Sequence, residues 1–430
     1  MKPAAHTAAA IEVLADLDAH HRPAADALKD WGRSHRFAGS KDRAQIASLV
    51  YDVLRKRASL AWHMGAETPR ALVLGALAIA RGMDADAITA AFADSPHAPE
   101  ALSASERTAL ASGNLDDAPD WVRGDYPQWL DPHLARVFGE DRAAEGAALA
   151  ERAPLDLRVN TLKTTRENAL AELEHLGAEP TPHAPSGIRI PLLADGRGPP
   201  VQTEPAFING LVEIQDEGSQ IAALMANAKP GDRVIDLCAG AGGKTLALSA
   251  AMNNSGRIFA HDRDIRRLKP LYERAERAGV QNIEVRSPHR AQDVLADLAD
   301  TADLVVIDAP CTGIGTWRRN PDAKWRLRAD ALETRKKEQD SVLANAARLV
   351  KPGGRIAYIT CSLLADENED RLQSFRTVHT DFVPLPAKDA LEASGLNALA
   401  PHIMADGTAL MLTPRRSGTD GFFVALMQRL

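Results

Sequence analysis

The 430-residue sequence predicts a multidomain protein with an all-α N-terminal bundle, a small α+β module and a C-terminal α/β domain of the Rossmann-like type. Three observations support this prediction. In the first 120 residues, apolar residues recur at helical spacing. From about residue 155, strand-like and helix-like runs are mixed. From about residue 206, apolar runs alternate with amphipathic stretches. Such alternation is typical of a mostly parallel sheet covered on both faces, for which we expect seven strands. The expected domains are 1–120, 121–205 and 206–430.

Composition places the chain among ordinary soluble proteins. Hydrophobic residues make up 45% and charged residues 25% of the sequence, and no apolar run reaches the ~18 residues that a membrane span needs. Glu12, Asp16 and Asp18 interrupt the N-terminal stretch, which therefore lacks the core of a signal peptide. The three cysteines are widely separated, which argues against a disulfide framework and a metal site. We expect a cytoplasmic monomer without membrane contact or metal.

The net charge of −7 is distributed unevenly along the chain. Residues 22–57 hold 9 Lys and Arg against 4 Asp, and residues 318–337 hold 8 Lys and Arg against 3 acidic residues. Residues 82–120 hold 8 acidic residues against one Arg. Local fields decide where a polyanion docks, so a nucleic-acid partner is not excluded. Taken singly, each basic run is more often a solvated helix face.

The first 120 residues are predicted to be helical. An i, i+3, i+4 stripe of apolar side chains is formed by Ile46, Leu49, Val50, Val53 and Leu54. The apolar run at 71–80 is expected at the buried centre of a bundle. This part holds no obvious catalytic constellation, so we expect it to serve as a scaffold or a docking domain.

Strands and a helix are mixed in the next module. We expect strands at 155–159 and 188–191 and a helix at 165–176, in an arrangement like that of RNA-recognition modules. The polar run 158–163 is compatible with a phosphate contact and equally with a simple strand-to-turn transition.

Alternating strands and helices define the C-terminal domain. Its seven strands are expected at 233–237, 257–261, 283–286, 304–307, 355–360, 409–413 and 422–427. Helices are expected at 265–278, before Gly279, and at 331–350, before a Pro-Gly-Gly sequence.

The stretch VIDLCAGAGGKT at 234–245 joins a predicted buried strand to a helix through a glycine-rich turn, as in nucleotide-type cofactor sites. A phosphate-binding loop needs Gly where Cys238 stands, and a dinucleotide fingerprint needs Gly where Thr245 stands. Asp262 follows Gly240 by 22 residues and ends the next strand, where an acid would bind a ribose. The remaining alternative is S-adenosylmethionine, which has a ribose but no pyrophosphate.

Ligands of an open parallel sheet bind beyond the carboxyl ends of its strands. All three cysteines, Cys238, Cys311 and Cys361, are expected there, together with Asp308. Cys238 ends a buried strand, so its thiol is expected to be structural. The other two thiols and the carboxylate suit addition to cytosine. A thiolate attacks C6 while an acid assists at N3, and C5 becomes nucleophilic enough to take a methyl group from a sulfonium.

Six linked motifs point to one family. They are VEIQDEGS at 212–219, DLCAGAGGKT at 236–245, DAPCTG at 308–313, RRNPDAKW at 318–325, TCS at 360–362 followed by DENE, and DGFF at 420–423. In this order they resemble the Sun/RsmB-type RNA cytosine-5 methyltransferases over roughly residues 125–430. The resemblance implies a class I methyltransferase domain that uses S-adenosylmethionine. Residues 1–120 resemble the NusB-like RNA-binding domain of the ribosomal RNA members.

The resemblance implies a role for each site residue. Cys361 corresponds to the nucleophile, Cys311 to the second cysteine that assists product release, and Asp308 to the acid beside the cofactor and cytosine N3. The implied cofactor contacts are Cys238, Ala239, Gly240, Ala241, Gly242, Gly243, Lys244, Asp262 and Asp308. The DNA cytosine-5 enzymes use the cysteine of the earlier motif instead, which would be Cys311 here and would leave Cys361 unexplained.

Two positions depart from the family pattern. Gly240-Ala241 replaces the usual Ala-Pro of the glycine loop. His289 stands where an acid usually lies near the adenine amino group, and we expect this imidazole, or alternatively Gln292 or Asp293, to contact the cofactor in its place.

These features predict methylation of cytosine C5 in RNA through a covalent Cys361–C6 intermediate. The NusB-like segment favours 16S ribosomal RNA over the alternative of a tRNA substrate. A non-catalytic RNA-binding assembly factor is the second alternative. We expect an unstacked cytosine in a loop or bulge as the target, and the basic run 318–337 as a contact for RNA phosphates.

Overall fold

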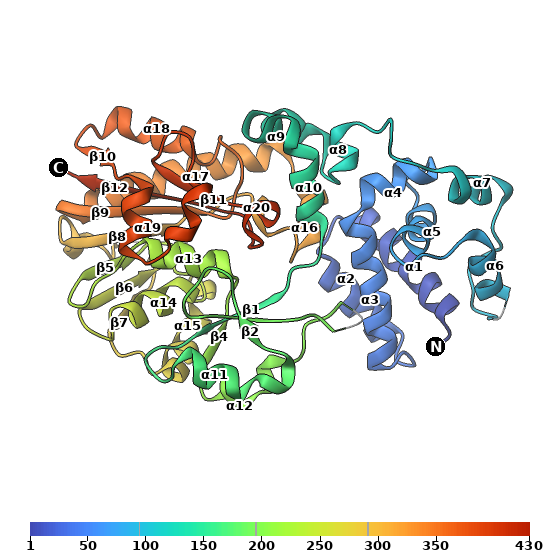
Figure 1. The fold of residues 1–430 in the computed structure, drawn as a ribbon, viewed down its shortest axis with the longest axis horizontal. Coiled ribbons are helices and arrows are strands. Elements are labelled where there is room, and N and C mark those ends of the chain that lie inside the picture. Colours follow the sequence, from blue (N-terminus) through green and yellow to red (C-terminus); the bar gives the residue numbers. More distant parts are fainter. Residues whose placement is uncertain (94, 194–195, 290–291) are drawn as a thin grey trace. The chain divides into compact units, whose positions relative to one another are not determined.

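The computed structural model describes residues 1–93, 95–193, 196–289 and 292–430. The chain forms two compact units (Figure 1). The helical unit consists of Met1–Arg152 and Trp317–Arg328, and the sheet unit consists of Ala153–Thr316 and Ala329–Leu430. No helix in the described ranges combines the length and the apolar character needed to cross a bilayer.

The helical unit has the predicted all-α architecture. Its helices are α1 (Pro3–His20), α2 (Ala24–Ser34), α3 (Ser40–Arg55), α4 (Arg57–Met64), α5 (Pro69–Ile79), α6 (Ala85–Ala93), α7 (Ala104–Ser112), α8 (Asp120–Arg123), α9 (Asp131–Phe138), α10 (Arg142–Ala150) and α16 (Pro321–Arg326). Helix α5 begins after Thr68, whose side chain accepts a hydrogen bond from Ala71 N at 3.2 Å. Residues 71–77 are all buried, so the apolar run forms the expected central helix.

Residues 317–328 return to the helical unit from far along the chain. Within this segment, Trp325 Nε1 donates to Leu54 O at 2.6 Å and Lys324 Nζ donates to Arg55 O at 2.7 Å, 269 residues away in sequence. Asp322 accepts from Ala24 N at 3.2 Å. The RRNPDAKW motif therefore anchors this segment to α2 and α3.

This anchoring corrects part of the predicted phosphate contact. Lys324 is only 1% exposed and Arg318 only 6% exposed. Side chains so deeply buried cannot present their charge to a polyanion without rearrangement. The basic run thus divides into a buried part, which holds the segment in place, and an exposed part that includes Arg319.

Burial of Lys324 predicts a specific pH dependence of stability. Burial lowers the pKa of Lys324 from its ordinary 10.5 to about 7. Between these pH values Lys324 is protonated in the unfolded chain and neutral in the folded chain. The free energy of unfolding therefore rises with pH, by at most ~1.4 kcal/mol per pH unit for this group. We expect the unfolding free energy of the wild type, relative to Lys324→Met, to increase from pH 7 to pH 9.

Tryptophan fluorescence measures this difference for the helical unit alone. All six tryptophans, at 31, 62, 121, 129, 317 and 325, belong to that unit. Urea unfolding of both proteins at the two pH values gives the difference, with Lys29→Met as the exposed control. A difference that stays constant with pH would show that Lys324 titrates alike in both states.

A four-stranded antiparallel sheet forms the smaller part of the sheet unit. The strand order is β2-β3-β1-β4, with β1 (Leu155–Val159), β2 (Glu179–Pro180), β3 (Gly187–Ile190) and β4 (Val212–Ile214). Helices α11 (Arg166–Glu172) and α12 (Pro205–Ile208) accompany it. Arg158 donates to Gln215 Oε1 at 2.6 Å, and the Asn160 side chain donates to Ala278 O at 2.8 Å. Both residues are buried, so they bond the protein interior instead of an RNA backbone.

The larger sheet is mostly parallel but has eight strands instead of the predicted seven. Its order is β10-β12-β9-β8-β5-β6-β7, with β11 paired to β12. The strands are β5 (Arg233–Asp236), β6 (Arg257–His261), β7 (Ile283–Arg286), β8 (Ala302–Asp308), β9 (Val350–Thr360), β10 (Phe382–Pro384), β11 (Ala409–Leu412) and β12 (Phe422–Arg429). The unpredicted strand, β10, has three residues and ends in proline, so no alternation could identify it.

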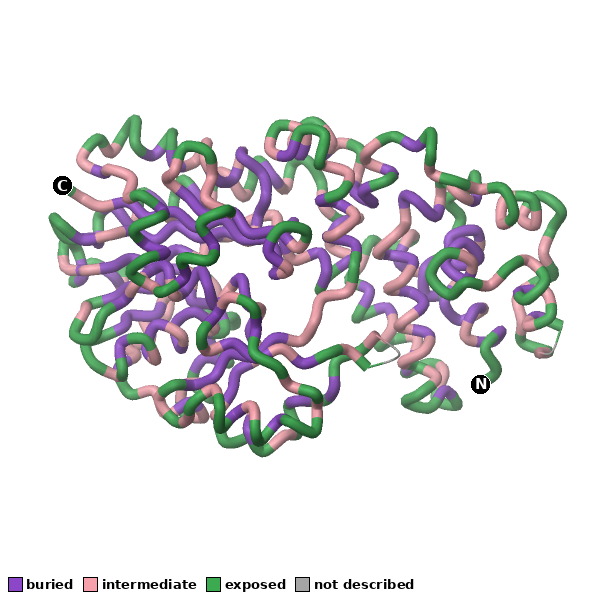
Figure 2. The backbone as a smooth tube through the Cα atoms, viewed as in Figure 1, coloured by how far each residue is buried: buried purple, intermediate pink, exposed green. Residues whose placement is uncertain are grey.

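Helices cover this sheet and complete the core. Helices α13 (Glu217–Met225), α14 (Gly243–Ala251) and α19 (Ala387–Ala393) share one apolar cluster with the strands. Helix α17 (Ala329–Leu349) packs against β8 and β9, and α18 (Glu369–Val378) packs against α17. Helix α15 (Ile265–Ala278) ends at Gly279 as predicted. Figure 2 shows the central strands of this sheet as buried.

Candidate active site

The glycine-rich turn lies at the carboxyl end of β5 and leads directly into α14. Gly240 N donates to Asp262 Oδ2 at 3.0 Å, which ties the turn to the end of β6. Gly242 has φ +84°, and a Cβ added there would lie 2.2 Å from Leu271 Cδ1 in α15. The backbone can take this path only without a side chain at position 242.

A methyl group at position 242 is therefore expected to disrupt the turn. Gly242→Ala introduces both left-handed strain, ~1–2 kcal/mol for a residue with a Cβ, and an overlap with buried Leu271. We expect cofactor affinity, measured by calorimetry, to fall at least about tenfold, which corresponds to ~1.4 kcal/mol.

Gly407→Ala is the matched control for this prediction. Gly407 has φ +76°, but an added Cβ would meet open space among the described atoms. The control carries the same backbone strain without the overlap, so its cofactor affinity should match the wild type. Equal affinities for both variants would mean that the turn adapts to the extra methyl group.

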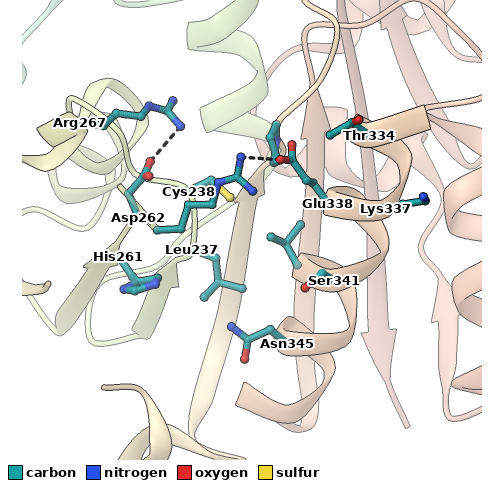
Figure 3. Close-up of a pocket in the computed structure, with 13 residues that line it drawn as sticks. Leu237, Cys238, His261, Asp262, Arg267, Thr334, Lys337, Glu338, Ser341 and Asn345 are labelled. Carbon is teal, nitrogen blue, oxygen red and sulfur yellow. Dashed lines mark ion pairs between the residues drawn. The ribbon is translucent and has the colours of Figure 1, made fainter. Parts of the chain in front are cut away.

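A cavity of about 470 Å³ opens beside the turn. Figure 3 shows Cys238, Asp262 and Arg267 on one side and Glu338, Ser341 and Asn345 of α17 on the other. Arg267 pairs with Asp262 at 3.2 Å. A second ion pair joins Arg263 to Glu338, and both residues line the cavity.

The residues around this cavity fit S-adenosylmethionine. The glycine-rich turn begins two residues after Cys238 of the wall, and the Asp262 carboxylate in the same wall can accept from a ribose hydroxyl. Asp262 and Cys238, two of the predicted cofactor residues, line the cavity directly, and the predicted Gly240–Lys244 segment continues from Cys238. His289 is exposed and does not line it.

The two predicted catalytic cysteines meet at the ends of neighbouring strands. Cys311 follows β8 and Cys361 follows β9, and their sulfur atoms lie 3.3 Å apart as free thiols. Gly315 N donates to Cys361 O at 2.9 Å, which connects the two loops. The hydrogen bond with Cys361 and burial raise the pKa of the Cys311 thiol well above its ordinary value. Cys311 therefore stays protonated and can donate to the Cys361 sulfur.

The predicted acid, Asp308, lies at the end of β8 beside a buried cation. Lys244 Nζ donates to Asp308 Oδ2 at 2.7 Å and lies 5.0 Å from the ring centroid of Phe422. Lys244 is 6% exposed, while the Asp308 side chain is 36% exposed. The carboxylate thus has a fixed partner on one side and access to a ligand on the other.

Cys238 differs from the other two cysteines. Burial is the main reason that its pKa lies well above the ordinary value, so the thiol is not activated as a nucleophile. We expected this thiol to be structural, and it lies in the wall of the cavity.

Two parts of the site were not predicted from the sequence. Asp236 is fully buried, accepts from Thr245 Oγ1 at 2.7 Å, and has its pKa raised to about 7, mainly by burial. Asp236 lies within a predicted strand, and nothing in the sequence indicated that its carboxyl group would be buried against Thr245. The cavity wall from α17 was also missed, because its polar side chains resemble those of any amphipathic helix.

The fold and the site define a class I methyltransferase that uses S-adenosylmethionine. Residues 223–428 match the family model described as 16S rRNA methyltransferase RsmB/F, and residues 126–192 match the ferredoxin-like domain of RsmF/B-like methyltransferases. The chain belongs to the RsmB/F methyltransferase family. This membership confirms the resemblance seen in the motifs.

Individual relatives show the same similarity. A probable ribosomal RNA small subunit methyltransferase B from Synechocystis is 30% identical over 307 residues, which cover 71% of this chain and 67% of the relative. The Bacillus subtilis protein of the same name is 31% identical over 307 residues, covering 71% and 66%. The chain thus spans about two thirds of these relatives. The crystal structure of PH0851 superimposes with a TM-score of 0.73 at 26% identity, covering 100% of this chain and 99% of that one.

Proposed function

We propose that the protein methylates C5 of a cytosine in small-subunit ribosomal RNA through a transient bond between Cys361 and C6. The observation that carries this proposal is the pair of free thiols, 3.3 Å apart, at the ends of β8 and β9. The names of the relatives from Synechocystis and Bacillus subtilis support ribosomal RNA as the substrate. All the groups that the reaction needs come from one chain, so we propose a monomer as the active form.

Covalent chemistry is needed because C5 of cytosine is a weak nucleophile. The Cys361 thiolate forms a bond to C6, and the electron pair of the C5–C6 double bond moves through the ring while N3 takes a proton that the Asp308 carboxylate relays from Lys244. Bound S-adenosylmethionine supplies an electrophilic methyl group on its sulfonium, and C5 takes that methyl group. The chain holds the two reacting carbons against the strand ends for this step.

Release restores the aromatic ring. The C5 proton passes to water, the C5–C6 double bond forms again, and the C6–S bond breaks with its electron pair returning to the Cys361 sulfur. N3 returns its proton through Asp308 to Lys244. Because Cys311 stays protonated and touches the Cys361 sulfur, its S–H stabilises the departing thiolate. One proton is released in each turnover.

A methylation assay tests this proposal. Purified protein is incubated with methyl-labelled S-adenosylmethionine and unmodified 16S ribosomal RNA, with unmodified tRNA in parallel, and the labelled nucleoside is identified by mass spectrometry. We expect label in 5-methylcytidine from the ribosomal RNA. Label in tRNA alone would contradict the substrate, label in another nucleoside would contradict the base, and RNA binding without transfer would support an assembly factor.

A further inference from the structure

A buried glutamate connects the two loops that carry the thiols. Glu367 is 0% exposed and lies six positions after Cys361. Its Oε1 accepts from Thr312 N at 2.9 Å, and its Oε2 accepts from the hydroxyls of Thr312 and Ser362. Thr312 directly follows Cys311 and Ser362 directly follows Cys361, so one carboxylate holds the neighbour of each thiol.

Further hydrogen bonds fix this carboxylate and the other side of each loop. Gln339 Nε2 donates to Glu367 Oε1 at 3.0 Å and to Pro310 O at 2.9 Å, one residue before Cys311. Tyr358 Oη donates to Glu367 O at 2.7 Å. The adjacent Asn368 accepts from Thr360 Oγ1 at 2.6 Å, one residue before Cys361. Residues on both sides of both thiols are thereby tied to one buried network.

We propose that Glu367 is a positioning residue that sets the separation of the Cys311 and Cys361 sulfur atoms. The effect of this separation on catalysis rests on the proposed function, whereas the separation itself can be measured in the protein without RNA. Burial raises the pKa of Glu367, while the hydrogen bonds from Ser362 and Thr312 oppose that rise. Because several donors bind this buried carboxylate, the two loops can separate only after those hydrogen bonds break.

The alternative is that Glu367 only stabilises the fold. Glu217 provides a matched control because it is also 0% exposed, lies in the same unit, and accepts from His183 N at 2.6 Å and Ala184 N at 2.8 Å. Those donors belong to the small sheet module and not to either thiol loop. Glu217→Ala therefore removes a buried carboxylate of similar bonding without touching the residues beside the cysteines.

Disulfide formation measures the sulfur separation without any RNA. Diamide takes two electrons and two protons from the thiols and becomes a hydrazine as the Cys311–Cys361 bond forms. The rate depends on how often the sulfurs meet in bonding geometry. We expect rapid formation in the wild type and in Glu217→Ala, and a rate roughly tenfold or more lower in Glu367→Ala. Peptide mass spectrometry identifies the pair, and circular dichroism verifies the fold.

Methylation kinetics give the second readout. We expect kcat of Glu367→Ala to fall roughly a hundredfold, with KM for S-adenosylmethionine unchanged within about twofold, because the cofactor cavity is not altered. Glu367→Gln keeps the shape and one acceptor oxygen, and the two hydroxyls can turn to accept from its amide, so it should restore most of the disulfide rate and of kcat.

Two results would overturn the proposal. One is a folded Glu367→Ala protein whose disulfide rate and kcat equal those of the wild type. The other is an equal loss in Glu217→Ala, which would assign the effect to general destabilisation. If Glu367→Ala does not fold, Glu367→Gln and Glu367→Asp take its place, and a shorter Asp that behaves like Gln would contradict the positioning role. Absence of methylation in the wild type would instead contradict the proposed function.

Discussion

Replacing Cys361 with alanine is expected to abolish methyl transfer to RNA while leaving cofactor binding intact. The variant removes the only sulfur assigned to bond C6, and without that bond C5 stays too weak a nucleophile for the methyl group. We expect the rate to fall below about one thousandth of the wild-type value, as when other covalent nucleophiles are removed. Transfer of label from methyl-labelled S-adenosylmethionine measures the loss.

Cys361→Ser is the matched variant for this experiment. Its hydroxyl is close in size to the thiol and can still contact Cys311, but it is a far weaker nucleophile. Calorimetry should show cofactor binding by both variants at wild-type affinity. Activity that survives in either variant would contradict the assignment, and loss of activity only with Cys311→Ala would assign the nucleophile to Cys311 instead.

Replacing Cys311 with alanine is expected to trap a covalent protein–RNA adduct. The contact at 3.3 Å lets the protonated Cys311 stabilise the Cys361 thiolate when it leaves C6. Without that donor the free thiolate is less stable relative to the C6–S bond, so release slows more than attack. We expect an RNA-labelled band of increased mass on a denaturing gel, and turnover lower by roughly two orders of magnitude.

The double variant identifies the bond in that adduct. Cys311→Ala combined with Cys361→Ala should give no adduct, because the attacking sulfur is gone. An adduct that persists would come from another group. A Cys311→Ala protein that binds RNA, forms no adduct and turns over normally would show that Cys311 has no part in release.

The sequence could place the thiols at one edge of the sheet because of where they lie relative to the strands. Each cysteine lies within three residues of the end of an apolar strand, and the carboxyl ends of parallel strands meet at one edge of a sheet. Local patterns therefore sufficed to bring Cys311, Cys361 and Asp308 to one place. The same reasoning predicted Asp262, which the structure connects to the glycine turn through Gly240.

Other features depended on burial or on very short elements, which no local pattern reveals. The basic run at 318–337 suggested an RNA contact throughout, yet Lys324 and Arg318 are buried within the helical unit. His289 is exposed, and its contact with the cofactor stays a prediction. The short edge strand β10 gave too few residues for any periodicity.

The sequence by itself determined the fold class, the kind of cofactor and the strand ends at which the cysteines lie. These follow from spacing within single strands, helices and turns, where the chain's own periodicity carries the information. Only the tertiary structure decided the 3.3 Å separation of the sulfurs, the Lys244–Asp308 pair and the burial of Glu367 between two loops. Each depends on side chains 50 or more residues apart in sequence, whose contact is set by packing and not by local pattern.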